Sequence, residues 1–179
     1  MSEDLPTYAA FDGPRCIARG TLADAAVAVR AAMGTGAAGP LLVFDCTTGQ
    51  VVDLDLRGSP EEVAGRVTPG PARGRPKLGV VPREVTLLPQ HWAWLNRQPG
   101  GASAMLRRLV DAARRSPDMR RREARDAAYR FIAAMAGDLP GFEEASRALF
   151  AGDAAGFTAR LAAWPADVRD LAMEIAREA

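Results

Sequence analysis

The first third of the chain alternates short apolar runs with turn residues, which predicts a small α+β fold over residues 1–68. Residues 7–20 hold two apolar runs separated by an Asp-Gly-Pro turn, typical of a hairpin. Apolar positions then recur at helical spacing over 21–33, behind a threonine that can cap the helix. A continuous apolar strand follows at 41–44, and a short helix with proline in its first turn is expected at 59–67.

Residues 51–57 alternate apolar and polar side chains without interruption, which predicts a half-buried strand after the turn at Thr47-Thr48-Gly49. The positions expected to face inward are Val52, Leu54 and Leu56. Asp53 and Asp55 then lie on the solvent-exposed face of the strand. Alternation alone explains this acidic pair without a metal or catalytic role.

The pattern changes twice more along the chain. Residues 69–82 are rich in proline and glycine and carry basic side chains, so they are expected to be an arm and not part of a helix or sheet. A strand followed by two helices is expected over 83–116. Residues 117–179 show four apolar stripes at helical spacing, separated by glycine or proline, and predict a helical bundle.

The segment 83–116 resembles the ribbon-helix-helix family of DNA-binding proteins. Glu84 to Leu88 is the expected strand, Pro89 opens the first helix, a Gly-Gly break follows, and Ser103 is the expected N-cap of the second helix. A lone strand is not stable in water, which favours a homodimer whose two strands form one antiparallel ribbon. The resemblance implies that strand side chains enter the major groove of DNA and that the start of the second helix holds a phosphate.

These expectations assign residues to two surfaces. The DNA-binding side chains of the module are expected to be Arg83, Thr86, Ser103, Arg107 and Arg108. The dimer interface is expected to comprise Val85, Leu87, Trp92, Leu95, Leu106 and Leu109. The strand register stays open, because either Glu84, Thr86 and Leu88 or Arg83, Val85 and Leu87 can face the groove. The alternative is a helical hairpin inside a larger core, with the strand completing the N-terminal sheet.

The arm contains Arg73-Gly74-Arg75-Pro76-Lys77, which resembles the core of an AT-hook. Glycine has no Cβ, so an extended Arg-Gly-Arg can lie deep in a narrow minor groove, where A·T tracts concentrate negative potential. Arg73, Arg75 and Lys77 are therefore candidate DNA contacts. The alternative is a solvated basic linker.

Charge distribution strengthens the DNA interpretation. The whole chain has a net charge of +1, yet residues 66–126 contain 14 arginine or lysine residues against 5 acidic ones. The remainder holds 9 basic and 17 acidic residues, so the middle of the chain is expected to meet a polyanion. The arginines between 114 and 125 can either follow phosphates or form a solvated face paired with nearby carboxylates.

Other classes of function find little support in the sequence. It contains no P-loop, dinucleotide fingerprint, nucleophile elbow or zinc-ligand spacing, so we expect neither an enzyme nor a bound cofactor or metal. Cys16 and Cys46 are expected to be buried, reduced thiols. No apolar run approaches the roughly 20 residues that span a bilayer, and the N-terminus lacks export signals, so a cytoplasmic protein without membrane contact is expected.

The order of all these pieces resembles DUF2239, a bacterial family whose domain has no assigned function. The stretches that carry the resemblance are 42–45, 52–58, 73–78, 84–94 and 141–145. The expected function is therefore a DNA-binding regulator or DNA-architectural homodimer, with flanking domains that engage an effector or protein partner. The alternative is an interaction module whose basic belt binds an acidic protein.

Overall fold

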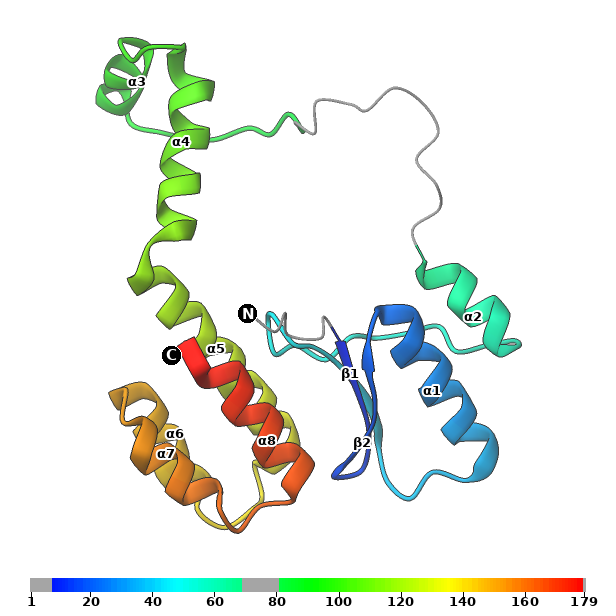
Figure 1. Cartoon of the computed structure of the whole chain (residues 1–179). Coiled ribbons are helices and arrows are strands. Elements are labelled where there is room, and N and C mark those ends of the chain that lie inside the picture. The colour runs from blue at the N-terminus through cyan, green and yellow to red at the C-terminus, as the bar shows by residue number, and fades with distance from the viewer. Residues whose placement is uncertain (1–7, 69–80, 179) are drawn as a thin grey trace. The chain divides into compact units, whose positions relative to one another are not determined.

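The structure is a computed structural model that describes residues 8–68 and 81–178, and it has an α+β fold (Figure 1). The chain divides into two compact units. The larger unit combines the N-terminal residues up to 69 with residues 121–179, and the central unit comprises residues 70–120.

A three-stranded antiparallel sheet lies in the larger unit, in the order β2-β1-β3. The strands are β1 (Tyr8–Asp12), β2 (Arg15–Gly20) and β3 (Leu41–Asp45). The expected hairpin and apolar strand are confirmed. Helix α8 (Ala166–Ile175) runs beside the edge strand β2, where the Asp167 carboxylate accepts the Cys16 N–H at 2.8 Å and Arg19 pairs with Glu174. These contacts cover an edge that would otherwise be open to pairing with another chain.

One face of the sheet is covered by a capped helix, and a second capped helix packs against the first. Thr21 forms the expected capping box with Asp24 at the start of α1 (Leu22–Thr35), and Ser59 does the same with Glu62 at the start of α2 (Pro60–Val67). Each box satisfies two N–H groups that have no partner inside the helix. The apolar side chains of α1 pack on Ala10 and Val43 of the sheet.

Residues 51–57 do not form the expected strand. Val51 makes a single bridge with Phe44, and the backbone then leaves the sheet. The last hydrogen bond to the sheet is the one that the Val52 N–H donates to the Val43 carbonyl at 2.7 Å. Further along, the Arg57 N–H donates to the Asp55 carboxylate at 3.2 Å, so a local contact holds the end of the segment. The alternation itself is confirmed. The side chains that were expected to face inward pack against the apolar cluster between α1 and the sheet, and their neighbours are exposed. The inward side chains are Val52, Leu54 and Leu56.

The opposite face of the sheet packs on the C-terminal helices. These are α5 (Pro117–Ala136), α6 (Phe142–Ala151), α7 (Ala154–Leu161) and α8, followed by the short helix η1 (Ala176–Glu178). Three aromatic rings lie at the centre of this contact. The ring centroid of Phe131 of α5 lies 5.7 Å from that of Phe11 and 4.9 Å from that of Phe44. All three are fully buried, so residues 8–68 and 121–178 share one hydrophobic core.

A turn after β3 fixes the sheet against α5. Gly49 has φ +67°, and a Cβ added to it would lie 1.9 Å from the Ala127 carbonyl oxygen. Only glycine allows this approach, because the contact distance is far below any van der Waals separation. Arg130 of α5 also donates to the Thr48 carbonyl at 2.9 Å.

Candidate nucleic-acid interface

The central unit contains the segment in which a ribbon-helix-helix module is expected, and its two helices form. Helix α3 spans Pro89–Asn96 and α4 spans Gly101–Arg115. Residues 84–88 form no strand in the described part of the chain. This differs from the sequence expectation, since residues 81–120 offer the segment no partner strand. A ribbon between two chains stays a prediction.

The side chains of the extended segment separate into two groups. Leu87 is half-buried against the helices, whereas Arg83, Val85, Thr86 and Leu88 are exposed. Val85, which is expected at the dimer interface, is half exposed in the single chain. This orientation of Leu87 corresponds to the register in which Glu84, Thr86 and Leu88 point outward.

The start of α4 corrects one expected site residue. The helix begins at Gly101, with Gly100 as N-cap in the left-handed region at φ +85°, so Ser103 lies in the first turn and is not the N-cap. Glycine tolerates this backbone conformation without the Cβ clash that serine would suffer. The Gly101 N–H donates to the Gln98 carbonyl at 2.9 Å, but no side chain caps the helix, so the next N–H groups of its first turn can meet an outside acceptor.

Helix α4 separates apolar and basic side chains. At 100° per residue, Leu106, Leu109, Val110 and Ala113 fall on one side, and the basic side chains fall on the other; these are Arg107, Arg108, Arg114 and Arg115. None of its residues is fully buried in the single chain. The apolar side of the helix is therefore exposed to solvent in the single chain.

The exposed apolar side continues into a hollow between α3 and α4. It is lined by Leu87, His91, Trp94, Leu95, Leu106 and Leu109. Leu95 is only 3 % exposed and anchors the two helices to each other, whereas Leu109 and Val110 are 43 % and 56 % exposed. Trp94 faces the hollow, while Trp92, the tryptophan expected at the interface, is outside it and partly exposed.

The arginines of α4 have different environments. Arg108 donates to the Pro99 carbonyl at 2.6 Å and ties α4 to the preceding turn. Arg107, Arg114 and Arg115 are exposed and form no ion pair within the described residues. Arg114 and Arg115 belong to the arginine run for which the sequence left phosphate contact and a solvated face open. The signal for Arg114 is its spacing, because it follows Arg107 by seven residues and so lies two turns along the same face.

Two further groups of basic residues belong to the arm and to α5. The candidate contacts Arg73, Arg75 and Lys77 lie outside the described residues. On α5, Arg122 lies 3.9 Å from Asp126, so this part of the arginine run is paired as a solvated helix face would be. Surface pairs of this kind contribute little to stability.

Alternative chemical sites are weak in the described part of the chain. No cluster of three or more potential metal ligands occurs there. Burial raises the pKa of Cys46 to about 12 and also raises the pKa of Cys16, so both free thiols stay protonated and unreactive at neutral pH. No described helix has the length and apolarity to cross a membrane.

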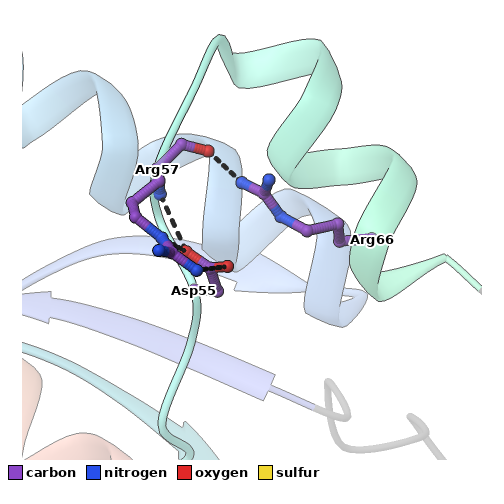
Figure 2. Close-up of polar contacts among 3 residues, drawn as sticks. All are labelled: Asp55, Arg57 and Arg66. Carbon is purple, nitrogen blue, oxygen red and sulfur yellow. Dashed lines mark hydrogen bonds and ion pairs between the residues drawn. The ribbon is translucent and has the colours of Figure 1, made fainter.

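The acidic pair after β3 also has a structural explanation. Figure 2 shows the Arg57 side chain folded onto Asp55, with both ion-pair contacts at 2.8 Å, while Arg66 of α2 donates to the Arg57 carbonyl. Hydrogen bonds from Arg57 hold the pKa of Asp55 well below its usual range. A carboxylate occupied in this way is a poor general base. The hydrogen bond from Arg66 to the Arg57 carbonyl is the contact that fastens the loop to α2.

Comparison with known proteins yields one match. The family model described as an uncharacterized protein conserved in bacteria (DUF2239) matches residues 7–176. Neither the curated proteins nor the solved structures contain a significant match.

Proposed function

Because the chain belongs to the DUF2239 family of bacterial proteins, whose description assigns no activity, we propose a function from its own residues: it binds duplex DNA as a homodimer, through the central unit and its basic arm. We place it among regulators or DNA-architectural proteins and assign it no catalytic step. The alternative function is binding of an acidic protein by the same basic surface.

The two-sided character of α4 carries this proposal. An apolar side without cover favours a second copy of the same helix, and dimerisation doubles the number of arginines presented to one ligand. Unpaired arginines at seven-residue spacing, Arg107 and Arg114, suit the regular negative charge of a nucleic-acid backbone. An AT-hook-like arm containing Arg73 and Arg75 would add contacts in the minor groove.

Replacing Val110 by Asp is expected to abolish the dimer without unfolding the chain. Val110 is exposed in the single chain, so the aspartate remains solvated in a monomer, whereas burying it in an interface leaves an unpaired charge. Size exclusion with light scattering should give a dimer for the wild-type protein and a monomer for V110D. The matched control is Val51→Asp in the larger unit, where valine is 48 % exposed, and this variant should remain dimeric. A wild-type protein that is monomeric at high micromolar concentration would refute the dimer.

The DNA surface is tested by the paired substitution Arg107→Gln with Arg114→Gln. Loss of two phosphate contacts in each protomer should weaken binding of a labelled 30-mer duplex at least tenfold and make the salt slope shallower by about three to four. Fluorescence anisotropy measures both quantities. Arg15→Gln with Arg160→Gln removes the same charge from exposed positions in the larger unit and should change affinity less than twofold. Equal weakening by the two pairs would mean that only net charge matters and that α4 is not the DNA surface.

A further inference from the structure

A hollow of about 280 Å³ lies among helices α6, α7 and α8 of the larger unit. Leu149 of α6 and Phe157 of α7 line it and are almost fully buried, and Met173 of α8 adds a half-buried wall. The wall that these three side chains form is therefore apolar and belongs to the packed core.

Small residues keep this hollow open. All three helices contribute to its lining, and alanine or glycine occupies the positions that a larger side chain would use to fill it; they are Ala148, Gly152, Ala154 and Ala176. Protein interiors are otherwise packed as densely as organic crystals. An apolar space of this size at the surface suits the apolar part of a small ligand.

One cation lies at the rim. Arg177 lines the hollow, is exposed, and forms no ion pair among the described residues. The first turn of α7 contributes Ala154 to the same rim, with the positive end of the helix dipole. The rim also includes Asp153, whose carboxylate accepts the Gly156 N–H at 2.9 Å as the helix cap. An anionic group is therefore favoured on the Arg177 side of the opening.

We propose that this hollow binds a medium-chain aliphatic carboxylate, with its hydrocarbon chain against Leu149, Phe157 and Met173 and its carboxylate against Arg177. A carboxylic acid is ionised at neutral pH and forms a charge-assisted pair with a guanidinium. This site is independent of the proposed DNA surface, since all its residues belong to the larger unit.

Calorimetric titration of the full chain with octanoate tests the site, and 1-octanol serves as the uncharged probe with the same chain. Octanoate should bind at least tenfold more tightly than octanol. Arg177→Gln should lower octanoate affinity at least tenfold and leave octanol unchanged. The matched control Arg160→Gln, an exposed arginine of α7 outside the hollow, should alter neither.

Two further variants examine the rim and the interior separately. Asp153→Asn keeps a good helix cap but removes the negative charge, so octanoate affinity should rise. Ala154→Leu fills the hollow from an exposed position and should weaken both probes. The proposal is overturned if octanoate gives no binding at 5 mM, if octanol binds as tightly as octanoate, or if R177Q binds octanoate like the wild-type protein.

Discussion

The affinity of the protein for duplex DNA is expected to fall roughly a thousandfold between 50 and 200 mM salt. The basic segment from Arg66 to Asp126 carries an excess of nine positive charges per chain, since it has 14 basic and 5 acidic residues. If a third of these charges meet phosphates, a dimer makes about six contacts, and the plot of log K against log salt has a slope of roughly −5.

This slope separates DNA from an acidic protein partner. A duplex releases condensed counterions when its phosphates are neutralised, whereas salt acts on protein pairs mainly by screening. The measurement is an anisotropy titration of a labelled 30-mer duplex at several salt concentrations. Undetectable binding at low salt rejects the DNA function, and a slope shallower than about −2 moves the acidic-partner alternative into first place.

Replacing Phe131 by Ala is expected to lower the free energy of unfolding of the larger unit by about 3 to 5 kcal/mol. Phe131 is fully buried between the rings of Phe11 and Phe44, so truncation leaves a cavity where the sheet meets α5. Because residues 8–68 and 121–178 share this core, both should lose stability together. Urea unfolding followed by circular dichroism gives the change in free energy.

The matched control is Phe150→Ala in α6. Phe150 is 50 % exposed and contacts Tyr129 at 5.3 Å between ring centroids, so its loss should cost about 1 kcal/mol or less. Separate unfolding transitions for the sheet and the C-terminal helices in F131A would contradict the shared core.

Local signals in the sequence predicted most of the elements because their causes lie within a few residues. Thr21 and Ser59 form capping boxes with acids three positions later, and both helices begin where the sequence indicates. The start of α4 was predicted wrongly, since Ser103 is a typical cap residue but Gly100 takes the left-handed conformation that begins the helix. Residues 51–57 carry a strand pattern, yet only Val51 bridges to the sheet, and the end of the segment is held by the local Asp55–Arg57 contact.

The shared core could not be predicted from these signals. Periodicity shows which side chains of α5 are buried, but it does not say that Phe131 meets Phe11 and Phe44, more than 80 residues earlier. The turn at Gly49 illustrates the same limit. Its glycine is expected for any tight turn, whereas its need to lie against the Ala127 carbonyl depends on distant packing.

The candidate DNA surface was predicted in part. Charge counting located the basic segment, and helical spacing located the apolar side of α4. The contacts of the individual arginines could not be predicted from the sequence. Arg108 donates to the Pro99 carbonyl, whereas Arg107 and Arg114 have no ion pair in the described residues. The sequence pattern likewise did not show that Val110 is exposed in the single chain, which makes this residue suitable for testing dimerisation by substitution.

The contacts between β2 and α8 have a consequence for biosynthesis. The Cys16–Asp167 hydrogen bond spans 151 residues, and the Arg19–Glu174 pair spans 155. A ribosome adds about 5 to 20 residues per second, so the hairpin emerges many seconds before the helix that covers its edge. During that interval α1 can fold onto one face of the strands, while the Phe11 and Phe44 face stays open. We therefore expect the nascent chain to present an apolar sheet face of the kind that chaperones bind, for the time that translation takes to reach the end of α5.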